Sequence, residues 1–159
     1  MNTNGYATNA IKMKGSASMM YFRLILMVGP AGSGKTSALQ EVSARTSAPL
    51  VNVNLELSRR MLDLTERRRA LQLPQLLDEI VSEASGELIL LDNIEILFDV
   101  RLKQDPLRLL QGLSRNKTVV AAWNGLIVDS HLTYAVPDHP EYRRYPTGGF
   151  LVVSPEVMI

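Results

Sequence analysis

The stretch GPAGSGKT, residues 29–36, lies between the apolar run RLILMV, residues 23–28, and the helix-like segment SALQEVSART, residues 37–46. Three glycines, a proline, a lysine and a threonine give it a composition that serves no packing purpose. Glycine lets the backbone take positive φ, so that successive N–H groups can point inward around an anion. The start of a helix adds partial positive charge at the same place. The stretch is therefore expected to hold phosphate.

The order of these residues fits G-x-x-x-x-G-K-[ST], the phosphate-binding loop of P-loop proteins, which joins a strand to a helix. We expect Lys35 to reach the β- and γ-phosphates of ATP, and Thr36 to place its hydroxyl on Mg²⁺. The alternative is a tight strand-to-helix turn whose lysine meets only solvent. The expected nucleotide-binding residues are Gly29, Pro30, Ala31, Gly32, Ser33, Gly34, Lys35, Thr36 and Ser37.

A second part of the site is expected at the end of ELILLD, residues 87–92, which is a second apolar run. A carboxylate at the end of a neighbouring strand would hold the magnesium, usually through water, so Asp92 joins Thr36 on the metal side. The alternative for Asp92 is a plain N-cap. Many ATP-hydrolysing P-loop proteins carry glutamate directly after this aspartate, whereas this chain has Asn93. Glu95 can take that role if the chain turns there, and otherwise it is a surface carboxylate.

Two further segments follow the pattern of AAA-type ATPases. Asn124 ends the apolar run at 118–124 and resembles the sensor asparagine beside the γ-phosphate, although Asn-Gly is also a turn signal. Arg143 and Arg144 lie in HPEYRRYP, residues 139–146, and resemble the arginines that such proteins offer to a neighbour's γ-phosphate. A solvated basic turn is the equal alternative. The first interpretation implies that the active protein is a homo-oligomer with an arginine acting in trans.

Short apolar runs alternate with longer helix-like segments, which favours parallel βαβ units. We expect an α/β fold, a three-layer P-loop NTPase core with a mostly parallel five-stranded sheet flanked by helices. Residues 1–20 are expected to form a flexible tail, 21–159 one P-loop NTPase domain without a separate lid domain, and 125–149 a loop or short helical excursion. The expected strands are 22–28, 50–55, 87–92, 118–123 and 150–154.

Three helices are expected between these strands. The middle one should have Pro74 in its first turn and Gly86 at its stop, and the last should begin at Asp105-Pro106. The first should begin within the glycine-rich stretch and end near residue 46. Its expected inward stripe is Ala38, Leu39 and Val42.

Composition limits the remaining function classes. The chain has 159 residues, 46% of them hydrophobic and 21% charged, which is ordinary for a soluble globular domain. Seventeen Lys and Arg against sixteen Asp and Glu leave a net charge of +1, so charge alone predicts no nucleic-acid partner, and DNA contact stays open. No run approaches the ~20 apolar residues of a membrane span. The absence of cysteine excludes disulfides, and the absence of a signal peptide favours a cytoplasmic location.

Three other patterns are less informative. The segment SRRMLDLTERRR, residues 58–69, carries five arginines and is either a charged helical face or a surface for nucleic acid or an adjacent subunit. The phrase NKTV, residues 116–119, lacks the aspartate of the guanine signature, so GTP is not expected. His131 and His139 lie eight apart, a spacing without metal logic, so no metal beyond magnesium is expected.

Taken with the phosphate loop and the Asp92 strand, three phrases give the chain its resemblance to a known family. They are NVNLELSRR (52–60), QDPLRLLQGLSRNKTVVAAWNG (104–125) and HPEYRRYP (139–146). Over roughly residues 24–153 the chain resembles BrxF, the family of small P-loop proteins in type 3 BREX phage-defence systems of bacteria and archaea. The resemblance implies a nucleotide-binding component of a multi-protein system that methylates host DNA and blocks phage replication, with other proteins of that system as partners.

Three functions remain open at this point. The first is an oligomeric AAA-like ATPase that drives a partner complex in defence. The second is an assembly switch that binds ATP with little hydrolysis, which the asparagine at position 93 favours. The third is a small-molecule P-loop kinase, which would need an acceptor pocket and an arginine-bearing lid.

Overall fold

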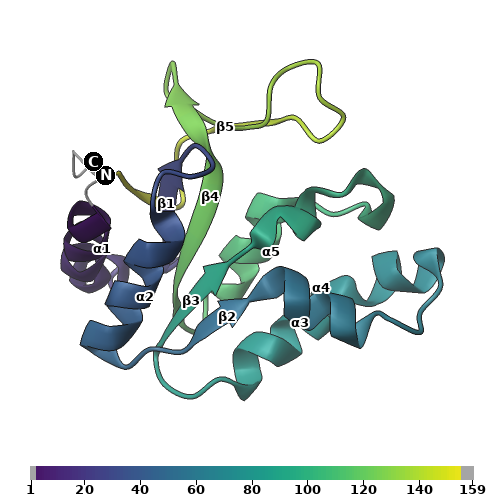
Figure 1. Ribbon diagram of the computed structural model, residues 1–159, viewed down its shortest axis with the longest axis horizontal. Coiled ribbons are helices and arrows are strands. Elements are labelled where there is room, and N and C mark those ends of the chain that lie inside the picture. Colours follow the sequence, from purple (N-terminus) through teal and green to yellow (C-terminus); the bar gives the residue numbers. More distant parts are fainter. Residues whose placement is uncertain (1–2, 155–159) are drawn as a thin grey trace.

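The computed structural model describes residues 3–154, which form one central sheet between two layers of helices (Figure 1). The main part of the sheet has the strand order β2-β3-β4-β1-β7, and each neighbouring pair in it is parallel. The expected α/β fold, with a mostly parallel sheet flanked by helices, is thereby confirmed, but within residues 3–154 the sheet has seven strands rather than the five expected, because two antiparallel strands extend it. The five strands of the main part are β1 (Leu24–Gly29), β2 (Leu50–Asn52), β3 (Leu88–Asp92), β4 (Thr118–Val128) and β7 (Leu151–Val153).

Burial on both faces explains why the strand sequences are continuously apolar rather than alternating. All six residues of β1 are buried: Ile25 and Met27 pack on one side of the sheet, and Leu24 and Leu26 pack on the other. The register pairs Gly29 at the end of β1 with Asn124 on β4, and Asn52 on β2 with Asp92 on β3. The carboxyl ends of these strands therefore meet at one edge, where the functional side chains are expected.

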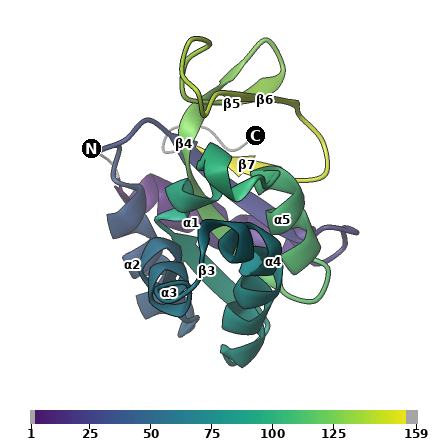
Figure 2. The same ribbon diagram turned by 90° about the vertical axis from the view of Figure 1, so that its right-hand side faces the viewer.

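The two helical layers cover opposite faces, as the turned view shows (Figure 2). Helices α1 (Thr3–Ala17) and α2 (Lys35–Thr46) share one core cluster with Ile25 and Met27. The larger cluster lies on the other face, beneath α3 (Val53–Arg60), α4 (Glu66–Glu83), α5 (Pro106–Leu113) and the short 3₁₀ segments η1 (Ile94–Phe98) and η2 (Val100–Leu102).

Helix α1 corrects the expectation of a flexible tail at residues 1–20. Its buried residues recur at helical spacing, so it lies close to the sheet and α2. Most of the buried residues are alanines, and because alanines are small and the rest of the segment is polar, its sequence shows no clear hydrophobic periodicity. Because the helix shares a core with the rest, we propose that the P-loop domain includes it and has no separate lid domain. The buried positions are Tyr6, Ala7, Ala10, Met13 and Ala17.

Helix α3 is not among the expected helices, and it begins at Val53, so the strand predicted at 50–55 ends at Asn52, whose side chain accepts a hydrogen bond from the Leu55 N–H and caps the helix. The three expected helices are present, and one of them differs at its start. Helix α2 begins at Lys35 and buries the expected stripe, and α5 begins at Pro106, where the Asp105 carboxylate accepts a hydrogen bond from the Arg108 N–H. Helix α4 begins at Glu66, so Pro74 lies inside it rather than in its first turn. The reason is an earlier N-cap, because the Thr65 side chain accepts a hydrogen bond from the Arg68 N–H.

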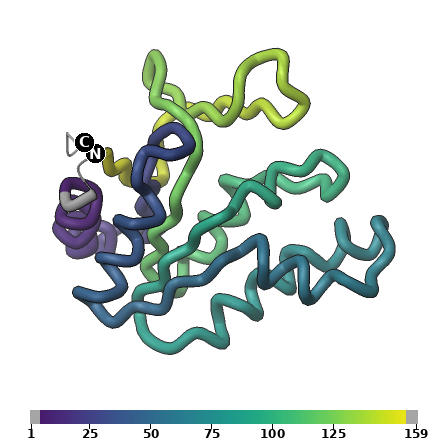
Figure 3. Tube along the Cα trace, viewed as in Figure 1, coloured from purple at the N-terminus to yellow at the C-terminus, as the bar shows by residue number. Residues whose placement is uncertain are grey.

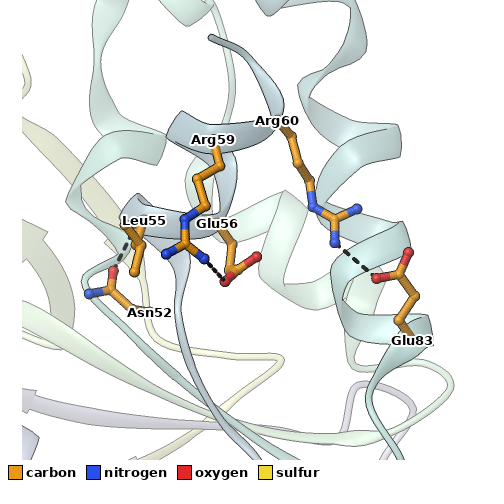
Figure 4. A network of polar contacts seen from close by, with 6 residues as sticks. All are labelled: Asn52, Leu55, Glu56, Arg59, Arg60 and Glu83. Carbon is orange, nitrogen blue, oxygen red and sulfur yellow. Dashed lines mark hydrogen bonds and ion pairs between the residues drawn. The ribbon is translucent and has the colours of Figure 1, made fainter.

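The arginine-rich segment 58–69 spans the end of α3, a turn and the start of α4. Arg60 forms an ion pair with Glu83 at 2.9 Å, and Arg59 forms one with Glu56 at 3.4 Å (Figure 4). These pairs are largely exposed to solvent, so each contributes little to stability. Their presence favours the interpretation of this segment as a charged helical face.

Residues 125–146 form an antiparallel extension of the sheet, here called the β arm. Beyond residue 124, β4 continues to Val128 and pairs with β5 (His131–Tyr134), which pairs in turn with β6 (Arg143–Pro146). The β arm projects past the end of the main sheet (Figure 3). The expected loop or helical excursion at 125–149 is therefore wrong. Asp129 and Ser130 both have positive φ, which is the geometry of a tight two-residue hairpin turn.

Candidate functional site

The phosphate loop, residues 29–36, connects β1 directly to α2 at the carboxyl edge of the sheet. Gly32 and Gly34 have φ of 77° and 92°, a backbone conformation that residues with a side chain rarely adopt. The Ser33 N–H donates to the Pro30 carbonyl at 3.2 Å, which closes the turn. The unpaired N–H groups of the first turn of α2 begin immediately after it. The loop thus has the geometry of an anion-binding cradle.

Lys35 occupies the centre of this loop. It is only 6% exposed, and its ammonium donates to the carbonyls of Gly29 at 2.7 Å and Pro30 at 2.6 Å, and to Ser33 Oγ at 3.0 Å. Burial lowers the pKa of Lys35, and the carboxylates of Glu95 and Asp92 oppose that shift. A positive charge is therefore held at the mouth of the loop by oxygen acceptors on several sides.

Thr36 and Asp92 meet across the site. The Thr36 hydroxyl donates to Asp92 Oδ2 at 2.7 Å, and Asp92 Oδ1 accepts from the Asn93 N–H at 2.9 Å. Asp92 is only 9% exposed because β3 ends inside the sheet edge. A hydroxyl and a carboxylate side by side are hard oxygen ligands of the kind Mg²⁺ takes. These two residues fit a magnesium ion. Within residues 3–154, no group of three or more His, Asp or Glu side chains is arranged to hold a metal ion by itself.

Glu95 is brought to the same edge by a turn at Asn93. Asn93 has a positive φ of 54°, so the chain reverses after β3 and enters η1 with Glu95 in its first turn. The Asn124 amide then donates to Glu95 Oε1 at 2.8 Å. Of the two interpretations of Glu95, a site residue or a surface carboxylate, the geometry favours the first.

A pocket of about 380 Å³ unites these groups. The phosphate loop and the start of α2 form one wall, and the end of β3, the two residues Asn93 and Glu95 after it, and Asn124 of β4 form the other. A second hollow, of about 590 Å³, adjoins it on the side of α3 and shares Glu95 as a lining residue. The smaller pocket holds the expected chemistry, with Lys35, Thr36, Asp92, Glu95 and Asn124 all lining it.

The structure does not bring the two expected arginines to this pocket. Both lie on β6 of the β arm, where Arg143 donates to the Gln104 carbonyl at 2.8 Å and Arg144 contacts His131 Nδ1 at 3.2 Å. Neither lines the pocket among the described residues. Within one subunit, the contacts of these two arginines are with the β arm and the segment before α5.

An aromatic cluster, which the sequence did not reveal, joins the site to the β arm. Phe98 of η1 stacks on Tyr134 of β5 with ring centroids 3.6 Å apart, and Trp123, which precedes Asn124, meets Phe98 edge-on at 5.1 Å. Tyr145 of β6 meets the same tryptophan at 6.1 Å. Burial raises the pKa of Tyr134 to about 12. These residues lie in separate stretches of sequence, so only the paired strands bring them together.

Tyr6 is a further residue near the site that the sequence did not predict. Its ring is fully buried, and its hydroxyl donates to the Val28 carbonyl at 3.0 Å and lies 3.3 Å from Ser33 Oγ. A tyrosine in a polar N-terminal segment carries no local signal that it will touch a loop 27 residues away.

The fold and the site together define a P-loop NTPase of the AAA class. The chain belongs to the AAA family, the ATPase family associated with various cellular activities, whose model matches residues 25–124. The match runs from β1 to the asparagine on β4 and includes the phosphate loop and both acidic site residues. Family membership implies nucleotide binding, typically with Mg²⁺, and AAA proteins commonly form oligomers.

Similarity to individual proteins is weaker. The structure of PCH-2 from C. elegans is 20% identical with a TM-score of 0.40, covering 80% of this chain and 37% of that one. The present chain therefore spans little more than a third of the length of that protein. A search of curated proteins finds no match. Among residues 3–154, the helices are all too short or too polar to pass through a lipid bilayer.

Proposed function

We propose that this protein binds ATP with Mg²⁺ in the 380 Å³ pocket and hydrolyses it to ADP and phosphate. The observation that carries the proposal is the bond between Thr36 and Asp92 at 2.7 Å. It brings the hydroxyl of the phosphate loop and the carboxylate of the adjacent strand to one point, beside the buried ammonium of Lys35. A tight turn without a ligand would not require this convergence of charge.

The residues divide the work of binding among themselves. The loop N–H groups and Lys35 bind the β- and γ-phosphates, where the backbone is already curled for an anion. Thr36 and Asp92 would hold a magnesium ion, which would supply charge neutralisation at the phosphate oxygens. The Lys35 ammonium exchanges part of its contact with loop carbonyls for phosphate oxygens, which are stronger acceptors because they are charged.

Glu95 orients the attacking water and accepts its proton as the oxygen attacks phosphorus. The bond to the γ-phosphorus forms as the bond to the bridging oxygen of ADP breaks, and phosphate leaves. Asn124 holds one carboxylate oxygen of Glu95 at 2.8 Å and leaves the other free to bind water. Asparagine at position 93, where many such ATPases have glutamate, is therefore compatible with hydrolysis. The turn at Asn93 brings Glu95, two residues further on, to the site.

The alternative is an ATP-dependent assembly switch with little turnover. The observation that favours it is the hydrogen bond from the Asn124 amide to Glu95, because an amide that holds the carboxylate also competes with water for it. The two functions differ in rate and share the binding site.

At a finer level, we propose that the chain acts as the nucleotide-binding component of a type 3 BREX defence system in the cytoplasm, with other proteins of that system as partners. Support comes from the BrxF-like phrases at 52–60, 104–125 and 139–146. We also propose a homo-oligomer in which Arg143 or Arg144 reaches the neighbour's γ-phosphate. Support for this comes from their position on β6, outside their own pocket. DNA contact remains an open part of this proposal.

Calorimetry and phosphate release test the proposed function. The wild type should bind ATP with magnesium, and turnover per subunit should rise with protein concentration if neighbours complete the site. Lys35→Ala should abolish binding, because the loop loses its only ammonium. Lys12→Ala is the matched control, since that lysine is exposed on α1. Full ATP affinity in Lys35→Ala would overturn the assignment of the pocket, and tight binding without turnover would favour the switch.

A further inference from the structure

Tyr6 connects the N-terminal helix to the underside of the phosphate loop. Its side chain is 0% exposed, although it belongs to a helix whose opposite side faces solvent. The hydroxyl donates to the carbonyl of Val28, the residue before the loop, at 3.0 Å. The same oxygen lies 3.3 Å from Ser33 Oγ, in the middle of the loop. One side chain of α1 therefore contacts both the entrance and the centre of the loop.

The hydrogen bonds around Ser33 form a directed chain. A tyrosine hydroxyl has one proton, and Tyr6 donates it to Val28, so Ser33 is the donor in the contact with Tyr6. The oxygen of Ser33 in turn accepts from the Lys35 ammonium at 3.0 Å. The direction runs from Lys35 to Ser33, to Tyr6 and to the Val28 carbonyl. Each hydroxyl in the chain both donates and accepts, so removal of one hydroxyl leaves its neighbours with fewer partners.

Gly29 shows how closely the loop fits this tyrosine. A Cβ at position 29 would overlap the Tyr6 hydroxyl and lie 2.7 Å from Ser33 Oγ. The first glycine of the motif is thus required by the contact with α1 as well as by the phosphate site. Burial raises the pKa of Tyr6, so the phenol keeps the proton that the chain of hydrogen bonds requires.

We propose that Tyr6 is a positioning residue for nucleotide binding: its hydroxyl fixes Ser33, and through Ser33 the Lys35 ammonium, in the arrangement that receives the phosphates. The inference rests on the proposed function, since it assigns Tyr6 a part in the same site. It also gives α1 a role beyond covering the sheet, because the helix carries the group that keeps the loop open in one conformation.

Tyr6→Phe and Ser33→Ala test this with small changes that keep the surrounding packing. Tyr6→Phe removes both hydrogen bonds of the Tyr6 hydroxyl, and loss of the one that holds Ser33 should weaken Mg-ATP binding by roughly two- to tenfold. The double variant should be no weaker than the worse single variant, because both break the same chain. Tyr21→Phe is the matched control, since Tyr21 is an exposed tyrosine at 67% and should bind ATP as the wild type does.

A measurement without nucleotide separates this inference from the proposed function. In the free protein, hydrogen exchange at the Ser33 amide should be faster in Tyr6→Phe than in wild type, because the Ser33 N–H bond to Pro30 closes the turn that Tyr6 supports. Failure of the wild type to bind ATP would sink the proposed function, while the exchange rates would still decide the role of Tyr6. Unchanged exchange and unchanged affinity in Tyr6→Phe would overturn the inference, as would a lower melting temperature with wild-type affinity. Ser33→Ala probes the same chain from the loop side if Tyr6→Phe does not fold.

Discussion

Asn124→Ala should reduce ATP turnover while leaving ATP binding intact. In the structure, the Asn124 amide donates to Glu95 Oε1 at 2.8 Å, and both groups are half-buried. A hydrogen bond to a charged acceptor is worth about 1.5–3 kcal/mol. If that free energy serves to orient Glu95 for the attacking water, its loss slows turnover by roughly 10- to 150-fold. Phosphate release at saturating Mg-ATP measures the rate, and calorimetry should give an ATP affinity within about twofold of wild type.

A double-mutant cycle with Glu95→Gln isolates the contribution of the bond itself. Glu95→Gln keeps an acceptor for Asn124 and removes the base, so turnover should fall by about 10²- to 10⁴-fold. Adding Asn124→Ala to that background should lower turnover little further, because glutamine cannot accept a proton from water and so has no base function left to orient. Fully additive effects would show that Asn124 acts on the phosphate directly. Normal turnover in Asn124→Ala alone would refute the argument that the bond orients Glu95.

Two other predictions follow from the buried charges. In Asp92→Asn, magnesium should no longer strengthen ATP binding, so calorimetry with magnesium and with EDTA should give the same affinity; a retained magnesium effect would contradict the metal assignment. Because burial lowers the pKa of Lys35 below its ordinary value of 10.5, the unfolded chain binds more protons than the folded one between the two pKa values, and the stability of the nucleotide-free protein rises with pH through that range. Urea unfolding near neutral pH and near pH 10 should show this gain in wild type relative to Lys35→Met, and an equal pH slope in both would contradict it.

The sequence was sufficient where chemistry and local structure coincide. Three glycines, Lys35 and Thr36 specify the phosphate loop within eight residues, and the apolar run that ends in Asp92 can only be a strand with its acid at the edge. The alternation of strands and helices predicts parallel pairing, and the strand order of the structure then sets Gly29 opposite Asn124. The fold class and the phosphate loop therefore follow from short patterns, whereas the position of Asn124 at the site depends on the strand order.

The main features that the sequence did not predict, which are the buried helix α1 and the β arm, depend on contacts between distant parts of the chain. Nothing near Tyr6 indicates a buried residue, because the apolar face of α1 is mostly alanine. The β arm rests on positive φ at Asp129 and Ser130, which are not glycines, so the turn carried no strong signal. The two arginines of the β arm are expected at the γ-phosphate of a neighbouring subunit, and within one subunit Arg143 donates to the Gln104 carbonyl.

The site is held together by three hydrogen bonds that each join separate elements. Tyr6 of α1 contacts the phosphate loop, Thr36 of α2 binds the acid of β3, and Asn124 of β4 binds the glutamate of η1. The last of these also bears on the β arm, because η1 carries Glu95 at one end and Phe98 at the other. Phe98 stacks on a tyrosine of β5 and meets the tryptophan next to Asn124, so the aromatic cluster packs together the elements that carry both partners of the Glu95 bond. The aromatic cluster therefore connects η1, which carries Glu95, to the β arm.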